Sequence, residues 1–287
     1  MPNWVTNRVV AEDFDKLQEA LINKETGEVD FNILKSMHDD LNITAGCGEY
    51  LTPLDYNPNK EVLKFQREKL NEFLQDRYNN TITQEQFVDR TLIHLVGTKL
   101  EQEIKEVYDI DKLGQQTREA IVNILKGYFN VQRYGYNNWY NAQRNEWGTK
   151  WNAHDTCVCG AEISFNTAWS TPMGIWEALS KITPITVAFA DEDTGSNCGI
   201  IKFEDGHAVS EFGRSDEAKN LNKDEQYLVD VGFALAIAGS NVEDFIDMYG
   251  DEEIEESFNT DKIRAEAIMK KSYAETKAVL VSNGFEM

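Results

Sequence analysis

The order of strand-like and helix-like runs along this chain constrains its fold most strongly. Apolar residues alternate as in short strands at 4–10, 155–159, 161–166, 185–190, 198–203 and 207–212. Helical spacing appears at 11–22 and 173–182. Gly160 separates two of the runs, which predicts a tight hairpin. Apart from one long interruption, the order from the N-terminus to residue 190 is strand, helix, strand, strand, helix, strand. This is the split βαβ order of ferredoxin-like domains, so we expect an α+β fold.

The interruption, residues 59–130, has an all-helical pattern. Thr83 and Gln86 form a capping box for one helix, and another helix follows Gly114. The apolar stripes of these amphipathic helices are typical of a core rather than of a ligand site. We therefore expect four parts: residues 1–57 and 133–214 as the two parts of a ferredoxin-like core, 58–132 as a helical insertion, and 215–287 as an acidic helical C-terminal extension.

The C-terminal extension ends in a long helix at about 261–283. One face of this helix is rich in small residues, among them Ala265, Ser272 and Thr276. Such a stripe suits packing against another chain and suits packing on the protein's own body equally well. Gly239 and Gly284 are expected to end helices, because glycine adopts the left-handed conformation of a helix C-terminus at little cost.

Four of the six tryptophans lie within residues 138–170, namely Trp139, Trp147, Trp151 and Trp169. Large aromatic side chains concentrate in cores and interfaces, so this segment should organise the fold. Gly148 allows a turn, Trp147 and Trp151 are spaced to clamp a helix end, and Trp169 ends a strand. We interpret these five residues as a structural motif.

Composition places the chain among globular proteins outside the membrane. Apolar residues make up 41% and aromatic residues 11%, and no apolar run approaches the length of a bilayer-spanning helix. The N-terminus lacks the pattern of a signal peptide. Four cysteines suggest no disulfide framework. We expect a cytoplasmic protein that does not bind membranes.

Net charge narrows the choice of partner. Fifty acidic residues against 28 basic ones give −22, and the largest share of this net charge, −10, lies in the C-terminal extension, where 17 acids accompany 7 bases. Such a field repels nucleic acid and attracts basic protein surfaces, so no direct nucleic-acid binding is expected. Solubility alone is the alternative explanation of the charge.

The stretch from Asp224 to Asp261 contains twelve acidic residues and no lysine or arginine. Like charges at helical spacing destabilise the helix that carries them, so local stability does not explain this arrangement. If one helix extends far enough, the first four acids of the candidate partner-binding surface share a face. That surface comprises Glu243, Asp244, Asp247, Asp251, Glu252, Glu253, Glu255 and Glu256.

Sequence motifs for catalysis are missing. No phosphate-binding loop, nucleophile elbow or zinc-protease motif occurs, so we expect no catalytic residue, cofactor or metal. Cys157 and Cys159 lie near His154, but a zinc site needs four ligands, and ordinary buried cysteines are the better interpretation. The acidic loop at 191–197 lacks the spacing of a calcium loop and is expected to be a hairpin turn.

Several separated blocks resemble the YubB-like ferredoxin-like family, whose members are carried by phages and conjugative plasmids. The blocks are Met1-Pro2-Asn3-Trp4 with Asn7-Arg8, Phe31-Asn32 with Leu34 and Met37, Trp139 with the run Trp147 to Asn152, and Phe165 with Thr167 to Ser170 and Pro172. The resemblance covers residues 1–44 and about 133–212. It implies the ferredoxin-like fold and a mobile-element origin, and it implies no particular activity.

These observations together favour a non-enzymatic inhibitor encoded by a phage or plasmid. It would bind a host anti-phage defence complex, for example a Gabija-type nuclease complex, and block its DNA-binding or assembly surface. A homo-oligomer is expected. One alternative is an enzyme with a cleft between core and insertion, using carboxylates or His154. Another is a housekeeping factor of the mobile element.

Overall fold

The structure is a computed structural model that describes residues 3–43, 82–95, 115–212, 220–248 and 251–286. The chain forms two compact units, Met1–Ser36 with Arg144–Met287, and Met37–Gln143. Each unit is described by itself. In the described ranges, no helix combines the length and the apolar character needed to cross a bilayer.

The first unit is built on a sheet in the order β2-β3-β1-β4-β5-β6, with every neighbouring pair antiparallel. Its strands are β1 (Trp4–Ala11), β2 (His154–Cys159), β3 (Glu162–Ala168), β4 (Ile185–Asp191), β5 (Cys198–Glu204) and β6 (His207–Phe212). The order β2-β3-β1-β4 is that of a ferredoxin-like domain, and β5 and β6 extend this sheet. The predicted α+β, ferredoxin-like fold is confirmed.

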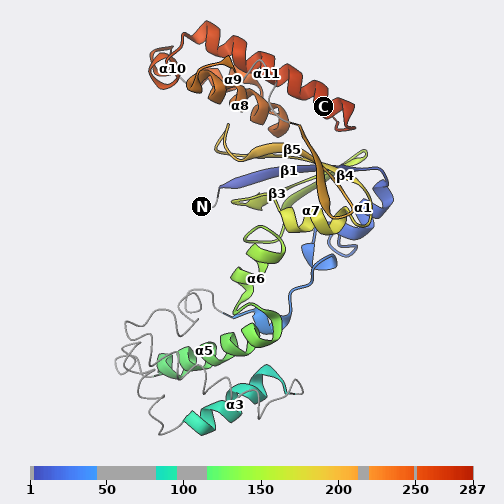
Figure 1. The fold of residues 1–287 in the computed structure, drawn as a ribbon, viewed down its shortest axis with the longest axis vertical. Helices are drawn as coiled ribbons and strands as arrows, with labels where there is room; N and C mark the ends of the chain where they lie inside the picture. Colours follow the sequence, from blue (N-terminus) through green and yellow to red (C-terminus); the bar gives the residue numbers. More distant parts are fainter. Residues whose placement is uncertain (1–2, 44–81, 96–114, 213–219, 249–250, 287) are drawn as a thin grey trace. The chain divides into compact units, whose positions relative to one another are not determined.

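Helices α1 (Phe14–Leu21) and α7 (Met173–Leu179) cover one face of the sheet (Figure 1). Helix α1 begins later than the predicted residue 11, because Asp13 caps it by accepting a hydrogen bond from the Lys16 amide. Phe165 of β3 lies 5.7 Å from Phe31 and 5.6 Å from Trp176, ring centre to ring centre. Phe31 begins the short 3-10 helix η1 (Phe31–Ile33). These aromatic side chains form the core beneath the helices.

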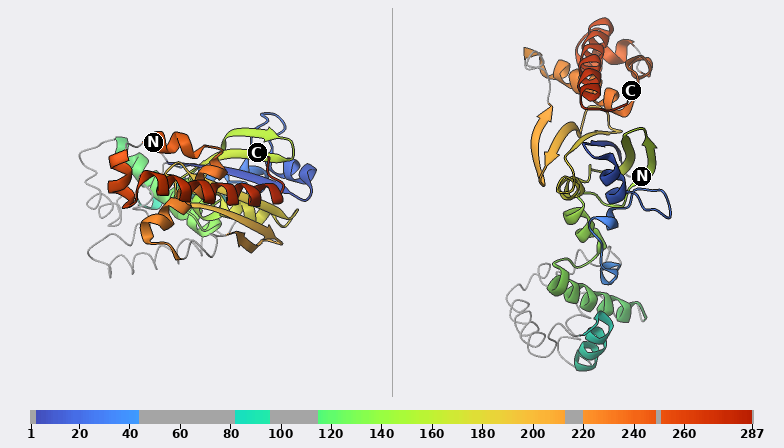
Figure 2. Two further views of the ribbon diagram at one scale, coloured as in Figure 1. Left: turned by 90° about the horizontal axis from the view of Figure 1, so that it is seen from above. Right: turned by 90° about the vertical axis from the view of Figure 1, so that its right-hand side faces the viewer.

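The opposite face is covered by C-terminal helices (Figures 1 and 2). They are α8 (Lys223–Ala238), α9 (Val242–Asp247), α10 (Asp251–Phe258) and α11 (Lys262–Ser282). Val10, Ala188 and Ile200 of the sheet pack with Ala234 and Ile237 of α8. The helices also enclose a core of their own, which contains Leu228, Val231, Leu235, Val242, Phe245, Ile246, Ile254, Phe258, Ala265 and Met269.

The small-residue stripe of α11 packs on the protein's own body. Ser272 Oγ donates a 2.7 Å hydrogen bond to the Val229 carbonyl of α8. A Cβ at Gly232 of α8 would lie 2.3 Å from the Met269 carbonyl oxygen, so only glycine permits this approach. The sequence left open whether this stripe packs against another chain or on the protein's own body. In the structure it packs on the protein's own body, against α8. Gly239, with φ +71°, ends α8 as expected.

The second unit contains η2 (Asp39–Leu41), α3 (Gln84–Leu95), α5 (Gln115–Tyr134) and the first part of α6 (Trp139–Glu146). The capping box at α3 is confirmed by hydrogen bonds from Thr83 N to Gln86 Oε1 and from Gln86 N to Thr83 Oγ1. The parts of the predicted helical insertion at residues 58–81 and 96–114 lie outside the described residues. The compact unit, 37–143, is wider than the predicted 58–132, because η2 packs against α5.

Candidate interaction surfaces

The acidic surface begins on α9, whose residues Glu243, Asp244 and Asp247 are exposed. Asn241 caps this helix, because its Oδ1 accepts a 2.6 Å hydrogen bond from the Asp244 amide. Glu243 Oε1 lies 2.7 Å from Lys270 Nζ of α11. The hydrogen bond from Lys270 lowers the pKa of Glu243, so this carboxylate stays charged and is partly neutralised within the chain.

The predicted row of acids along one helix does not form. Helix α9 ends at Asp247, with Met248 as its C-cap, and Asp251 begins the separate helix α10. Glu243, Asp244 and Asp247 therefore share a helix that excludes Asp251. The side chains of Asp251, Glu252, Glu253 and Glu255 lie outside what the structure describes, and Glu256 is exposed. Within the described part of the chain, neither Asp247 nor Glu256 has a basic partner.

Beneath the acids the same helices are apolar. Phe245 and Ile246 of α9 and Ile254 and Phe258 of α10 are buried in the core shared with α8 and α11. Because these side chains are buried, the opposite sides of α9 and α10 face solvent. Tertiary packing thus holds together helices whose repeated negative charge would destabilise them in isolation.

The tryptophan motif divides into buried and exposed members. Trp147 is 1% exposed, and its Nε1 donates a 2.9 Å hydrogen bond to the Lys35 carbonyl. Gly148 has φ +87°, and a Cβ there would lie 2.8 Å from the Met173 amide nitrogen. Trp147 is thus buried directly after the last residue of α6, and Gly148 adopts a left-handed conformation at a position where a side chain would not fit. Trp139 is half-buried beside Tyr140.

Trp151 and Trp169 reach the surface, with 37% and 51% of their area exposed. The ring of Trp151 lies 6.3 Å from that of Trp4, and Lys150 Nζ lies 4.6 Å from its centre. Trp169 follows directly after β3 with φ +70°, a conformation that is strained for a bulky residue. The Trp169 amide donates a hydrogen bond to the Asn3 carbonyl, and the Trp169 carbonyl accepts one from Asn197 Nδ2. These two bonds hold the backbone that presents the exposed indole.

A cavity of about 280 Å³ lies between the sheet and the C-terminal helices, and charged groups line it. Arg8 and Glu162 form a two-point ion pair there, with Nε–Oε1 at 2.5 Å and Nη2–Oε2 at 2.8 Å. Glu162 Oε2 also accepts the Glu286 amide at 3.0 Å, and Arg8 donates to the Glu286 carbonyl. Arg8 and Glu162 neutralise each other. Their hydrogen bonds to the Glu286 backbone attach the C-terminal residues to strands β1 and β3.

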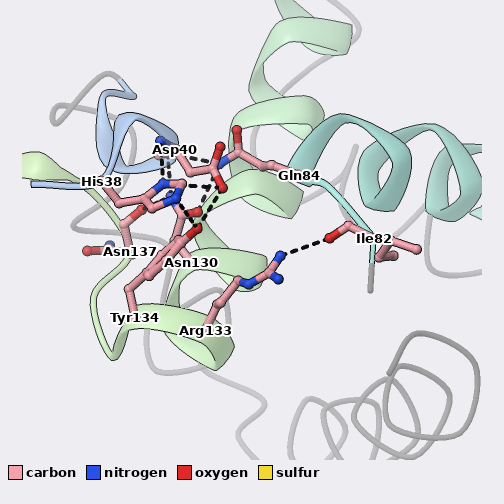
Figure 3. A network of polar contacts seen from close by, with 8 residues as sticks. All are labelled: His38, Asp40, Ile82, Gln84, Asn130, Arg133, Tyr134 and Asn137. Atoms are coloured by element: carbon pink, nitrogen blue, oxygen red, sulfur yellow. Dashed lines mark hydrogen bonds and ion pairs between the residues drawn. The ribbon is translucent and has the colours of Figure 1, made fainter. Parts of the chain in front are cut away.

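A polar network joins η2, α3 and α5 in the second unit (Figure 3). Gln84 Nε2 donates to the Asp40 carbonyl and to Asn130 Oδ1, both at 2.9 Å. Tyr134 Oη donates to Asp40 Oδ2 at 2.8 Å and lies 3.1 Å from His38 Nε2. Desolvation and the contact with Asp40 raise the pKa of Tyr134 to about 12. The phenol keeps its proton near neutrality, so the network acts as a structural clamp.

Two cysteines differ from the expectation of burial. Cys157 and Cys159 are both exposed on β2, which lies at the edge of the sheet, and their sulfur atoms are 2.9 Å apart. His154 Nδ1 lies 2.8 Å from Asp155 Oδ1, at the surface. Among the described residues, no three or more His, Cys, Asp or Glu side chains converge as a metal site requires.

Similarity to known proteins covers part of the first unit. Residues 146–231 match the family described as the ferredoxin-like domain in Api92-like protein. The match runs from the end of α6 through β6 into α8, and it leaves out β1, α1 and residues 1–44, where the sequence also suggested a resemblance. No curated protein and no solved structure matches the chain.

Proposed function

We propose that this protein is a non-enzymatic inhibitor that binds another protein through its acidic C-terminal helices. The observation that carries the proposal is the construction of α8–α11. These helices enclose their own apolar core and direct Asp247 and Glu256 outward, without a basic partner among the described residues. A basic surface on another protein would complement them.

Carboxylates and apolar groups would have different tasks in such a complex. Charges at the rim of an interface mainly accelerate association, whereas buried aromatic anchors supply most of the affinity. Exposed Trp151 and Trp169 are suited to the second task. Met248, 72% exposed, directly follows Asp247 and would place an apolar contact next to the charged one.

The specific target that we propose is a host anti-phage defence complex, such as a Gabija-type nuclease complex. A nuclease must expose a cationic groove for DNA, which carries one negative charge per about 1.7 Å of helix axis. Clustered carboxylates on α9 and α10 could occupy that groove or an assembly surface beside it. This form of the proposal also draws on the resemblance to proteins of phages and plasmids.

Self-association is part of the same proposal. Ile263 and Val281 of α11 are 82% and 58% exposed, although the opposite side of this helix is buried against α8. A second copy of the chain could cover these side chains. Native mass measurement of the purified protein would give the stoichiometry directly.

The test of the acidic surface is a charge reversal with a matched control. The test variant carries Lys at Asp247, Glu252, Glu253 and Glu256, and it leaves Glu243 and Asp244 in place because both have contacts inside the chain. The control variant carries Lys at Asp15, Glu25, Glu177 and Glu211, which are exposed on α1, α7, β6 and one turn. Both variants change the net charge equally.

We expect the test variant to bind the purified nuclease complex at least about tenfold more weakly, mainly through slower association, because opposite charges steer encounter. The control variant should bind like the parent protein. Surface plasmon resonance at two salt concentrations measures the association rate and the affinity of each variant. If the two variants weaken binding equally, net charge alone is responsible, and if neither does, the acidic surface is not the binding site.

A further inference from the structure

Strand β2 presents two thiols side by side on one face. Cys157 and Cys159 are two residues apart, so their side chains point to the same side of the strand. Both are exposed, and Cys157 Sγ lies 2.9 Å from Cys159 Sγ. Cys198, by contrast, is half-buried on β5. Cys157 and Cys159 are therefore accessible to small reagents, and each of them has the other's thiol within contact distance.

The backbone of β2 can accommodate a covalent bond between the two sulfur atoms. Two residues along a strand span about 6.6 Å between Cα atoms, which is near the upper end of the roughly 4.4–6.8 Å found across disulfides. Closure therefore requires a slight contraction of the strand. β2 lies at the sheet edge, and its pairing with β3 shifts register between His154 and Cys157. Residues 157–159 pair regularly with β3, but an edge strand pairs on one side only, so its contraction disturbs fewer ladder hydrogen bonds than contraction of a central strand would.

We propose that Cys157 and Cys159 are a redox-active thiol pair that closes reversibly into an intramolecular disulfide. The oxidant is a small disulfide, RSSR. One cysteine thiolate attacks a sulfur of RSSR, forms a mixed disulfide and releases RS⁻, which takes up a proton. The second thiolate then attacks the protein sulfur of the mixed disulfide, and the other RS⁻ leaves. The two protein thiols lose two electrons and two protons, and RSSR becomes two RSH.

Acidic groups and the neighbouring thiol suppress the ionisation of Cys159. The hydrogen bond with Cys157, together with the negative charges of Cys157, Glu286 and Glu162, raises the pKa of the Cys159 thiol. The Cys159 thiol therefore keeps its proton to higher pH than an isolated cysteine would. The Glu286 carboxylate repels an anionic disulfide, so a neutral disulfide should react faster than glutathione disulfide.

Contraction of β2 also sets the stability of the product. A strained and exposed disulfide is reduced more readily than a relaxed, buried one. The pair should therefore interconvert in ordinary thiol buffers instead of remaining permanently oxidised. This site does not depend on the proposed inhibitor function, because its chemistry needs no protein partner.

The experiment uses the full chain in buffers of defined ratio of 2-hydroxyethyl disulfide, a neutral oxidant, to 2-mercaptoethanol. Samples are quenched with N-ethylmaleimide and analysed by intact mass and peptide mapping. In oxidising buffer, we expect the peptide with Cys157 and Cys159 to lose both alkylation sites and carry no adduct. Cys198 should stay alkylated. Raising the thiol concentration should restore both sites.

Single substitutions separate closure from simple modification. In Cys159→Ser, Cys157 should retain the mercaptoethanol adduct, because no second thiol displaces it, and in Cys157→Ser the adduct should remain on Cys159 for the same reason. The proposal is overturned if wild-type protein accumulates the same stable adduct as Cys159→Ser. Disulfide-linked dimers, or alkylation of both sites at every buffer ratio, would overturn it as well.

Discussion

Helices α1 and α7 meet one face of the sheet through large aromatic side chains, whereas α8 and α11 meet the other face mainly through small and aliphatic ones. On the first face Phe165 and Trp176 are almost fully buried. On the second face, Ala188 and Ala190 of β4 pack with Ala234 of α8. Larger buried side chains contribute more free energy of folding, so the first face should be the more stable layer.

The two faces also differ in their buried polar groups. On the first face, Asn7 Nδ2 donates to Thr167 Oγ1, Thr171 Oγ1 donates to Asn7 Oδ1, and Trp176 Nε1 donates to Thr171 Oγ1, at 2.8, 2.6 and 2.8 Å. This network is neutral. On the second face, the ion pair of Arg8 and Glu162 holds the C-terminus. A neutral network carries no charge, whereas the largely buried ion pair leaves an uncompensated charge if either partner is removed.

The largest expected effect is on the aromatic face. Trp176→Ala should lower the free energy of unfolding by about 3–5 kcal/mol, because it leaves a large cavity and removes a donor to Thr171. Denaturant unfolding followed by circular dichroism measures the loss. Trp176→Phe is the control, since it keeps much of the volume and should cost less. A loss below about 1 kcal/mol for the alanine variant would contradict the ranking of the two faces.

A smaller and more local effect is expected from the ion pair. Arg8→Met leaves Glu162 buried without its cation and should destabilise the C-terminal layer by about 3 kcal/mol. Hydrogen exchange should accelerate in α8 and α11 while the strands β1, β3 and β4 stay protected. The double variant Arg8→Met with Glu162→Met removes both charges and should restore most of the protection. Uniformly faster exchange in both layers would show that the faces unfold together.

The smallest effect is a pH dependence at the start of α8. Arg264 Nε lies 2.5 Å from Glu225 Oε1, and this hydrogen bond lowers the pKa of Glu225 below its usual 4.5. The carboxylate therefore stabilises the fold above about pH 4.5, and this stabilisation is lost as pH falls through the lowered pKa. Glu225→Gln should lower the Tm by about 1–3 °C at pH 6 and by a smaller amount at pH 3. Thermal unfolding across this range measures it, and an equal difference at both pH values would contradict the assignment.

Local patterns in the sequence determined the elements of this protein. Alternating apolar residues predicted the strands, Gly160 predicted the hairpin between β2 and β3, and Thr83 with Gln86 predicted the start of α3. Each of these signals depends on residues within a few positions of one another. Their physical basis is the backbone conformation and the pairing of nearby polar groups, both of which are already defined in a short segment.

Tertiary structure decided which side chains are buried and which are presented. It buried Trp147 and exposed Trp169, brought Cys157 and Cys159 to an open edge, and separated α9 from α10 between Asp247 and Asp251. It also joined Arg8 to Glu162, which are 154 residues apart in the chain. Burial and long-range pairing depend on every element that packs nearby, and no local spacing encodes those neighbours.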